Sequence, residues 1–587
     1  MEWDLSVIYP SFEDEMFSSD FDSLTPQTDS LNVLLASDED ETALLEKVVG
    51  QLSCLIDTYT RLGAYINLTL ATDAEHKTAG CMRDKLMEKE ITLSQCISAF
   101  TRRLGQTEHL DEIIARSPIL QANGFALRNA KLMAQHTIDE MLEPWILKMS
   151  LSGGEAFSQL RDKLDATHMI DFRGESLPLS AIRAKAYDHA PDVRREAYEA
   201  ELNAYEKIAL PMSYCLNSIK AEAETIRQAK HYESVLDMTL TNSNMDRETL
   251  DAMWTAVKEY LPDLRRYLKA KAAYLGHKNG LPFYDLFAPV GGDQKVYAID
   301  EAVNILTAAF EPFNPKMAEF IRNAFDQRWI DLYPRKGKGG GAFCADVHCL
   351  GISRILTNYA GSFSDISTLA HELGHGWHDY CLKDMPVLMT DCPMPLAETA
   401  SIFNETMLVY QTMKSADDQT AFALIESELM EATQTVVDIY SRYLFETNVI
   451  TTRKDHTLSV DELKEMMLNA QEAAYGDGLD PNARHPYMWA CKPHYYFSNA
   501  HFYNFPYAFG LLFGKGVFAQ YLKKGSAFIP EYNRLLASSG SDTVVNIAAS
   551  AGINVRDADF WRSSLDVIRE SVNRFEALVN RKLNSPA

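Results

Sequence analysis

The stretch that decides the fold is residues 362–377, which read SFSDISTLAHELGHGW. Its polar start predicts a helix with Ser364 as the N-cap and Asp365 in the first turn, where a negative charge suits the helix dipole. His371 and His375 are four residues apart, so one face of this helix carries both imidazoles, one turn above the other. Two imidazoles placed in this way can bind one metal ion.

The HExxH pattern alone is a weak signal, because about 3% of chains with this composition and length contain it by chance. Its surroundings strengthen the metal interpretation: a cap and a strand-like segment precede it, and the helix has an apolar side formed by Ile366, Leu369, Ala370 and Leu373. Glu372 can reach a water on the ion without being a ligand itself. The sequence therefore predicts a zinc site with one Zn²⁺ per chain.

A hydrolytic zinc ion needs a third protein ligand and one open position. The run PMPLAETASIFNE at 393–405 offers a candidate, because two prolines end a loop and Glu398 is expected in the first turn of the following helix. We interpret Glu398 as the ligand and Glu405, two turns further along the same face, as an acceptor for an imidazole N–H. Asp379 and Asp391 compete as ligands, and Asp379 can instead serve as a partner of a liganding imidazole.

The overall composition excludes several classes of protein. The 56 basic and 82 acidic residues give a net charge of −26, which would repel nucleic acid and anionic lipid. The sequence has no apolar run of about 18 residues and no basic start followed by an apolar core, so we expect neither a membrane span nor a secretory signal. The nine scattered cysteines form no CxxC pair, and we expect reduced thiols in a cytoplasmic protein.

Helical periodicity dominates the chain, for example over residues 44–96, and Ser459 with Glu462 has the pattern of a capping box. The main interruption, at 333–359, begins YPRKGKGGGA, whose glycines exclude a helix interior, and continues into short strand-like segments. The pattern GxxxxGK[ST] of a phosphate-binding loop is absent, so we favour a small sheet. The expected fold is therefore mainly α, with a small β-sheet beside the HExxH helix.

The motif and its surroundings resemble the oligoendopeptidase F branch of the thimet-oligopeptidase family of zinc metallopeptidases. The resemblance rests on HELGH followed by ETASIFNE, the opening WDL with YP, the glycine segment 336–343 and FYNFPYAFG at 502–510, and it spans nearly the whole chain. It implies a zincin-like active-site helix, with the first glutamate of the downstream block, Glu398, as the third zinc ligand. It also implies two largely helical lobes around a deep substrate channel.

A channel of this kind would admit short unstructured peptides, which are the partners that the resemblance implies; nucleic acid and membranes are not expected partners. We predict an N-terminal helical lobe over residues 1–185 and a zinc metallopeptidase catalytic domain over residues 186–587. The boundary is placed where acidic, polar sequence gives way to long helices.

The family also places a histidine and tyrosines opposite the metal, on a loop that contacts substrate. The matching region is KPHYYFSNAHFYNFPY at 492–507, where His494, followed by two tyrosines, fits the family pattern better than His501. Tyr503 and Tyr507 match the family's pair of tyrosines spaced by four. A further tyrosine of the thimet enzymes has no counterpart in this sequence.

These assignments predict an endopeptidase in which Glu372 takes a proton from a zinc-activated water and delivers it to the leaving amine. Tyr507, with His494 or Tyr503, would donate hydrogen bonds to the oxyanion. The strand-like segment before the metal helix would bind the substrate main chain as an added strand. The alternatives are a zinc exopeptidase, such as a dipeptidyl carboxypeptidase or an aminopeptidase, and a binding protein with a vestigial metal site. The intact Glu372 weighs against the second alternative.

Overall fold

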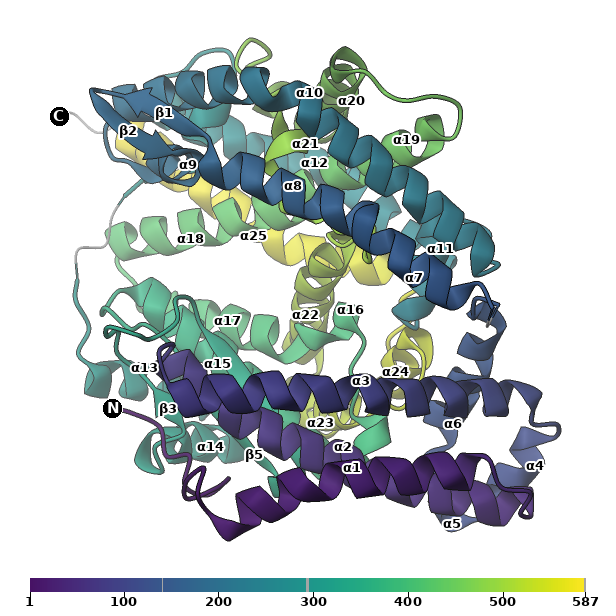
Figure 1. The fold of residues 1–587 in the computed structure, drawn as a ribbon. Coiled ribbons are helices and arrows are strands. Elements are labelled where there is room, and N and C mark those ends of the chain that lie inside the picture. The colour runs from purple at the N-terminus through teal and green to yellow at the C-terminus, as the bar shows by residue number, and fades with distance from the viewer. Residues whose placement is uncertain (140, 292–294, 585–587) are drawn as a thin grey trace. The chain divides into compact units, whose positions relative to one another are not determined.

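The computed structural model describes residues 1–139, 141–291 and 295–584 (Figure 1). Both of its compact units are largely helical and contain only short strands, so the prediction of a mainly α fold is confirmed. Each unit is assembled from three separate segments of the chain. Unit 1 comprises Met1–Thr137, Gln294–Lys414 and Gln520–Ile553, and unit 2 comprises Ile138–Asp293, Ser415–Ala519 and Asn554–Ala587.

The boundary near residue 185 that the sequence suggested lies inside unit 2 and does not coincide with a boundary between these units. The division into an N-terminal lobe and a catalytic domain stays a prediction. The substrate channel implied by the resemblance also stays a prediction.

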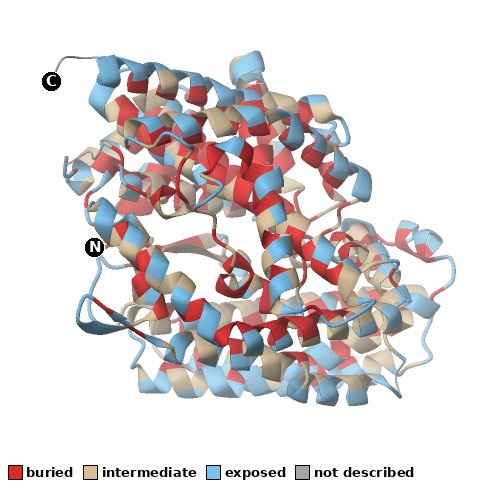
Figure 2. Ribbon diagram, turned by 90° about the horizontal axis from the view of Figure 1, so that it is seen from above, coloured by how far each residue is buried: buried red, intermediate tan, exposed pale blue. Residues whose placement is uncertain are grey.

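The N-terminal helices of unit 1 bury one face each. In α2 (Glu41–Thr72), Leu44, Val48, Leu55 and Leu62 recur at helical spacing and are fully buried. Figure 2 shows buried and exposed positions alternating along the helices in this way. Removing such stripes from water drives the packing of the helices. The remaining helices of this segment are α1 (Glu15–Leu35), α3 (Lys77–Gln106), α4 (Leu110–Ala115), α5 (Pro118–Ala122) and α6 (Gly124–Met133).

A three-stranded sheet lies in the same unit, with the strand order β3–β5–β4. β3 (Ile330–Asp331) runs parallel to β5 (Ile352–Leu356), and β4 (Phe343–Val347) pairs antiparallel with β5, which leaves β4 at an edge. The glycine-rich segment before β4 is anchored by Lys338, whose buried ammonium group donates to main-chain carbonyls on both sides of the turn. The predicted small sheet is therefore confirmed.

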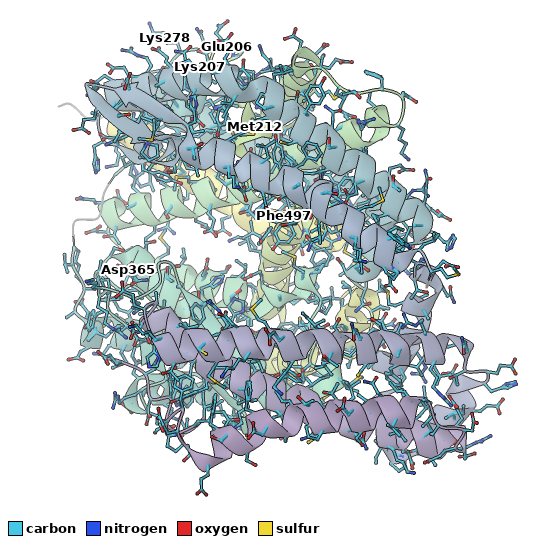
Figure 3. All side chains as sticks on the ribbon, in the orientation of Figure 1. Glu206, Lys207, Met212, Lys278, Asp365 and Phe497 are labelled. Atoms are coloured by element: carbon cyan, nitrogen blue, oxygen red, sulfur yellow. The ribbon has the colours of Figure 1, made fainter. Side chains whose placement is uncertain are left out.

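The helix that carries HExxH is α15 (Phe363–Leu382), and it begins with a capping box. The hydroxyl of Ser362 accepts the N–H of Asp365 at 3.1 Å, and the Asp365 carboxylate accepts the N–H of Ser362 at 2.8 Å; Figure 3 labels Asp365. The prediction of Ser364 as the N-cap is wrong by two residues. Ser362 caps the helix because its spacing from Asp365 satisfies two N–H groups at once.

α15 packs against both β4 and β5, so the small sheet lies beside the HExxH helix as expected. It also packs closely against α17 (Thr399–Thr412), and the approach depends on Gly374. A Cβ atom at this position would lie 2.7 Å from the carbonyl oxygen of Ala400 and 2.7 Å from the Cα of Ser401. The glycine therefore allows the start of α17 to lie near the histidines of α15.

A third neighbour of α15 comes from near the end of the chain. This is α23 (Ile529–Ala537), and just beyond it the hydroxyl of Ser539 lies 2.7 Å from Nε2 of the buried His378. Burial lowers the pKa of His378 to about 4, so the ring is neutral. His378 therefore joins two segments of the unit. The other helices of unit 1 are α13 (Ile299–Phe310), α14 (Pro315–Asp326), α16 (Met394–Ala397) and α24 (Val544–Ser550).

Unit 2 contains the long helix α10 (Pro191–Ala229), which packs against α8 (Gly154–Thr167) and α19 (Ile439–Arg453). Pro191 occupies its first turn, where the missing N–H is not needed. Ser459 and Glu462 form the predicted capping box at the start of α20, which is confirmed. The strands β1 (Met169–Phe172) and β2 (Glu175–Pro178) form an antiparallel hairpin.

The other helices of unit 2 are α7 (Glu143–Ser152), α8 (Gly154–Thr167), α9 (Leu179–Ala184), α11 (Val235–Asn242), α12 (Arg247–Tyr274), α18 (Asp418–Ala432), α19 (Ile439–Arg453), α20 (Val460–Tyr475), α21 (Met488–Cys491) and α25 (Ala558–Asn584). A π-helical segment, Thr433–Asp438, joins α18 to α19. Helix α22 (Phe505–Lys524) begins in unit 2, and its last residues belong to unit 1.

Across the ranges that the structure describes, no helix is both long and apolar enough to cross a membrane. All nine cysteines are free thiols. Burial raises the pKa of the thiols of Cys96, Cys215 and Cys491, which keeps them protonated. These three cysteines therefore act as small apolar side chains in the core.

Candidate metal centre

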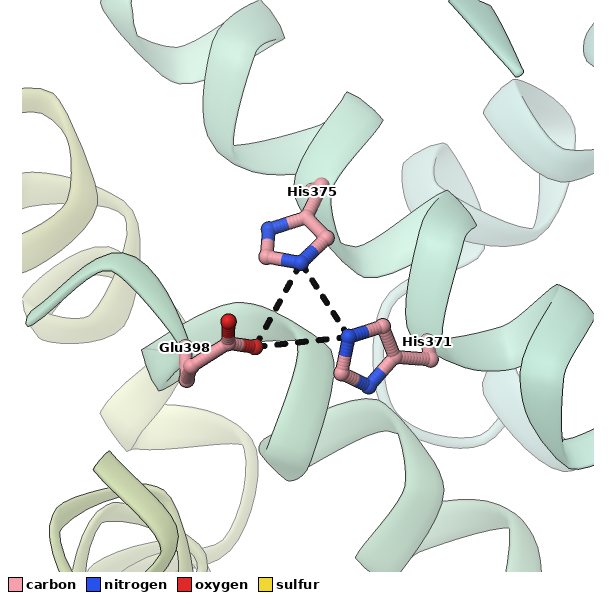
Figure 4. A group of neighbouring side chains, drawn as sticks. All are labelled: His371, His375 and Glu398. Atoms are coloured by element: carbon pink, nitrogen blue, oxygen red, sulfur yellow. Dashed lines mark hydrogen bonds and ion pairs between the residues drawn. The ribbon is translucent and has the colours of Figure 1, made fainter. Parts of the chain in front are cut away.

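Three side chains converge on one point in unit 1 (Figure 4). Nε2 of His375 lies 3.2 Å from Nε2 of His371, and Oε2 of Glu398 lies 3.3 Å from Nε2 of His371 and 3.4 Å from Nε2 of His375. Within the described part of the chain, this is the one group of three such side chains that could hold a metal ion. Asp379 and Asp391 are not members of the group.

The triangle has the size that a tetrahedral zinc ion requires. Nitrogen and oxygen ligands about 2.0–2.1 Å from such an ion lie about 3.3 Å from one another. The three sides of 3.2, 3.3 and 3.4 Å fit this value, and two imidazoles with one carboxylate form a donor set used by catalytic zinc. The residues present therefore fit a zinc ion with one coordination position left for water or substrate.

Glu398 lies between two short helices. It directly follows α16 and occupies the position before the first residue of α17, one residue earlier than the predicted first turn. The hydroxyl of Ser401 donates to its Oε2 at 2.7 Å, which orients the carboxylate. The side-chain amide of Asn404 donates to the carbonyl oxygen of Ala370 at 3.0 Å and ties α17 to α15.

Glu405 bonds to the opposite side of the same imidazole. Its Oε1 lies 2.5 Å from Nδ1 of His371, two helical turns beyond Glu398. A proton on Nδ1 leaves the lone pair of Nε2 directed at the point where the three side chains meet. Glu398 and Glu405 therefore contact the two ring nitrogens of one histidine.

The charges around the site favour a cation. Burial disfavours the protonated form of His371, but hydrogen bonds and charges from Glu398 and Glu405 outweigh it and raise its pKa to about 11. Burial opposes ionisation of Glu398 as well, yet the hydrogen bonds from His371 and His375 hold its pKa well below the usual range. The carboxylates thus stabilise a positive charge at the place where a metal ion would supply it.

Glu372 neighbours the ligands and is itself 5% exposed. Burial raises the pKa of its carboxyl group, although the nearby His371 and His375 act in the opposite direction. A buried carboxylate without a paired cation is unfavourable, so its position next to the imidazoles of two candidate metal ligands needs a chemical reason. A general base that exchanges protons with a water at the metal is such a reason.

Asp379 lies one turn beyond His375 and contacts the sheet. Its Oδ2 accepts the hydroxyl of Ser353 at 2.9 Å and lies 3.6 Å from Sγ of Cys344. These contacts tie α15 to β4 and β5. No hydrogen bond between Asp379 and His375 is present among the described residues, so the role of Asp379 in supporting a metal ligand stays a prediction.

The aromatic residues expected to contact substrate lie together in unit 2. The ring centroids of His494 and Tyr503 are 5.0 Å apart, and those of Tyr503 and Tyr507 are 5.9 Å apart. Phe497, labelled in Figure 3, lies with its ring centroid 5.4 Å from that of His494. All four side chains are partly exposed.

His501 has different surroundings from His494. It is 4% exposed, and its Nδ1 lies 3.4 Å from Nζ of Lys220, whose ammonium group is bonded to Glu446. Burial next to this cation lowers the pKa of His501 well below its usual value. The ring of His501 is buried beside a cation whereas that of His494 is partly exposed, which favours His494 as the residue that contacts substrate.

The residues that hold His494 were not predicted from the sequence. Nδ1 of His494 lies 2.7 Å from Oδ1 of Asn504, and the same oxygen accepts Nη1 of Arg442 at 2.8 Å. Asn504 lies in the FYNFPY segment, so this motif could have identified Asn504 as a functional residue. Arg442 and its ion-pair partner Asp438 form an ordinary i, i+4 pair in sequence, and no local pattern separates them from a solvent-exposed pair.

Comparison with known proteins shows that the chain is a peptidase. It belongs to Peptidase family M3, whose sequence model matches residues 184–567. Within this family the chain falls in the oligoendopeptidase F branch.

Two relatives illustrate the similarity. The chain is 24% identical to Group B oligopeptidase PepB of Streptococcus agalactiae over 100% of this chain and 98% of the relative. It is 25% identical to the chromosomal Oligoendopeptidase F of Lactococcus lactis subsp. cremoris over 66% of this chain and 64% of the relative.

Solved structures share the fold. A protein from Chlamydophila abortus matches with a TM-score of 0.87 at 22% identity, over 98% of both chains. Oligoendopeptidase-F from Enterococcus faecium matches with a TM-score of 0.71 at 17% identity, over 97% of this chain and 99% of the other.

Proposed function

We propose that this protein is a zinc-dependent oligoendopeptidase that hydrolyses internal bonds of short unstructured peptides. The observation that carries the proposal is the triangle formed by His371, His375 and Glu398, with sides of 3.2, 3.3 and 3.4 Å. Membership of Peptidase family M3 supports it, since relatives in the branch are named oligoendopeptidases.

His371, His375 and Glu398 would hold one zinc ion and leave its fourth position open. A bound zinc ion would supply a Lewis acid that polarises the scissile carbonyl and acidifies a water molecule. Glu372 takes a proton from the attacking water and delivers it to the leaving nitrogen, while the C–O bond forms and the C–N bond breaks. In this proposal Glu372 is first the general base and then the general acid.

The substrate main chain is proposed to pair with the free edge of β4. The N–H of Ile355 in β5 donates to the carbonyl of Trp329, on the β3 side, at 3.0 Å. Cys344 lies opposite Ile355 in the register, so this pair is not hydrogen-bonded, and the main-chain groups of Cys344 and Asp346 point away from β5. A peptide added at this edge gains main-chain hydrogen bonds without a strict choice of sequence.

A cavity beside β4 supports this placement. It has a volume of about 390 Å³ and lies between β4 and α2, with Gly63, Asn67, Phe343 and Ala345 among its lining residues. Its walls are partly polar and partly apolar, which suits substrate side chains of more than one kind. The cavity is therefore a candidate subsite for a side chain of the bound peptide.

Tyr507 and Tyr503 are proposed to donate hydrogen bonds to the negative oxygen that develops on the attacked carbonyl, and His494 is proposed to contact the substrate. The resemblance to the family supports these roles, as do the partial exposure of the three rings and their mutual contacts. One donor of this kind typically contributes about 3 kcal/mol to transition-state stabilisation.

An exopeptidase on the same scaffold is the second candidate, but relatives named oligoendopeptidase or oligopeptidase favour an endopeptidase. Internally quenched peptides with both ends blocked separate the two, because only an endopeptidase cleaves them. We expect mass spectrometry to find internal cleavage that stops with a chelator and returns with zinc. Activity that a chelator leaves unchanged would refute the zinc proposal, and cleavage of unblocked peptides alone would establish the exopeptidase.

The cytoplasm is the proposed site of action, where all nine free thiols would stay reduced. The net charge of −26 argues against nucleic acid as a partner. Cell fractionation with an antibody tests the location, and recovery of the protein outside the cytoplasmic fraction would contradict it.

A further inference from the structure

His494 is linked through a chain of hydrogen bonds to a buried ion pair in unit 2. Its Nδ1 lies 2.7 Å from Oδ1 of Asn504, which also accepts Nη1 of Arg442 at 2.8 Å. Nε of Arg442 donates to Oδ2 of Asp438 at 2.8 Å, and Tyr475 donates to the other oxygen of this carboxylate at 3.2 Å. Asn504 and Asp438 are 3% and 5% exposed, so the hydrogen bonds that they make are shielded from water.

The geometry decides which nitrogen of His494 carries the hydrogen. A guanidinium group can only donate, so the Asn504 atom that faces Arg442 must be the amide oxygen. The same oxygen faces His494, so Nδ1 of the imidazole must be the donor. In a neutral ring Nε2 then carries a lone pair and can only accept. No hydrogen bond to Nε2 from any described residue is present.

The surroundings also keep the ring neutral. Burial is the largest influence that lowers the pKa of His494, and the positive charges of Arg442 and Lys492 act in the same direction. The hydrogen bond to Asn504 and the charge of Glu446 act in the opposite direction without reversing the shift. The other ring neighbours are Phe497, Tyr503 and Tyr507.

We propose that Asp438, Arg442 and Asn504 are positioning residues that hold His494 as the neutral Nδ1–H tautomer, so that its Nε2 accepts a hydrogen bond from a main-chain N–H of the peptide substrate. This inference rests on the proposed peptidase function and deepens it. It separates the role of His494 from that of the tyrosines, because a neutral Nε2 without a hydrogen cannot stabilise an oxyanion. The tyrosine hydroxyls remain as donors for that purpose.

The proposal defines a substrate requirement. The residue that meets His494 must offer a main-chain N–H, so a proline, an N-methylated residue or an ester linkage at that position removes the contact. The side chain of that residue does not enter the interaction. The enzyme should therefore discriminate between peptides at one position by whether the backbone offers an N–H there.

The first test reads the tautomer without any need for activity. Side-chain ¹⁵N NMR of the full-length protein with labelled histidine, assigned by loss of the signal in His494→Gln, should show protonated Nδ1 and unprotonated Nε2 at pH 7. The Arg442→Met variant should show a mixture of tautomers, because the Asn504 amide is then free to turn. An Nε2–H tautomer or an imidazolium in the wild type would overturn the proposal.

The second test replaces each N–H of a good substrate in turn by an ester oxygen, leaving the scissile amide intact. One replacement should lower kcat/KM of the wild type roughly tenfold, the loss expected for one hydrogen bond. The same replacement should have little effect in His494→Ala. Equal sensitivity of both enzymes at every position would refute the contact. Cleavage of the all-amide parent peptide tests the peptidase function itself, so the two failures are distinguishable.

A third test uses the isosteric variant Asn504→Asp. A carboxylate still accepts from Arg442 and His494, but its charge stabilises the imidazolium, so the acidic limb of the kcat/KM profile should move to higher pH by about one unit or more. Asn499→Asp is the matched control, because Asn499 is exposed on the same loop, and its profile should equal that of the wild type. An unchanged profile in Asn504→Asp would contradict the positioning role.

Discussion

At the scale of single residues, the metal site is defined by how firmly one imidazole is held. His371 has a carboxylate at each ring nitrogen: Glu405 at 2.5 Å from Nδ1 and Glu398 at 3.3 Å from Nε2. Its ring can therefore turn little about the Cβ–Cγ bond. His375 has Glu398 at 3.4 Å from Nε2. The orientation of His371, the first of the proposed ligands, thus depends directly on Glu405.

The variant Glu405→Gln should bind zinc roughly 10- to 100-fold more weakly, because it loses the charge that orients His371 and makes it more basic. Titration against a competing chelator measures this affinity. Glu319→Gln, an exposed glutamate on α14, is the control and should bind zinc like the wild type. Equal affinity of Glu405→Gln and the control would show that Glu405 does not support the ligand.

Glu372→Gln should retain zinc but lose activity by about 10² to 10⁴-fold, the contribution typical of a positioned general base. The amide cannot take up the proton of the attacking water, whereas the three ligands are untouched. Metal analysis together with kcat measured on a quenched peptide checks both parts. Turnover near that of the wild type in this variant would refute the base assignment.

Tyr507→Phe should lower kcat about 10²-fold and change KM much less, because a hydrogen bond to the developing oxyanion is gained in the transition state. Steady-state kinetics over a range of peptide concentrations separates the two parameters. A large rise in KM with kcat unchanged would instead make Tyr507 a residue that binds the ground state.

At the scale of elements, the site depends on how closely α15 and α17 approach each other. Gly374 faces the first turn of α17 without space for a Cβ atom, and Asn404 bonds back to the carbonyl of Ala370 across the same contact. Only α17 brings Glu398 and Glu405 to the imidazoles. The distance between the two helices therefore controls the size of the triangle of ligand atoms.

Gly374→Ala should separate the helices and weaken zinc binding at least tenfold, since the new methyl group would lie 2.7 Å from main-chain atoms of Ala400 and Ser401. Gly50→Ala in α2 is the matched control, because nothing lies within 4 Å of its Cβ position and alanine favours a helix by about 1 kcal/mol. Zinc affinity by chelator competition and melting temperature are the measurements. Zinc binding by Gly374→Ala at the level of the control would contradict this account.

Local patterns explain which of these elements could be predicted. The spacings of His371 with His375 and of Glu398 with Glu405 are helical periodicities, so they are visible in sequence, as is the capping box at Ser459. The N-cap of α15 was misplaced because several polar residues adjoin its start and only the reciprocal bonds single out Ser362. The hydrogen bonds that link Asp438 to His494 join segments that are distant in the sequence. Such contacts produce no periodic sequence pattern, so they could not be predicted.

At the scale of the whole molecule, each unit is formed by three segments that are separate in the sequence. No shift in composition marks the positions where the chain passes from one unit to the other. These boundaries are set by long-range contacts, which sequence periodicity does not report. The mainly α class was predictable because it follows from helix periodicity summed over the chain. The assignment of each helix to a unit was not.

A metal that binds only the folded site must stabilise the protein by mass action. Zinc at 100 times its dissociation constant should add about 2.7 kcal/mol to the free energy of unfolding of unit 1. Scanning calorimetry with zinc and with a chelator should therefore show a higher melting temperature with zinc. His375→Ala should show no such difference, and an equal zinc-dependent shift in that variant would place the binding site elsewhere.

The contact of α15 with α23 and Ser539 bears on how the protein matures. The helix that bears both histidines, residues 363–382, is synthesised well before one of its packing partners, which emerges only with residues 529–539. Residues up to 539 must therefore leave the ribosome before the packing around α15 can be completed. A growing chain that ends before residue 529 would lack part of this packing, so we expect it not to hydrolyse other nascent proteins.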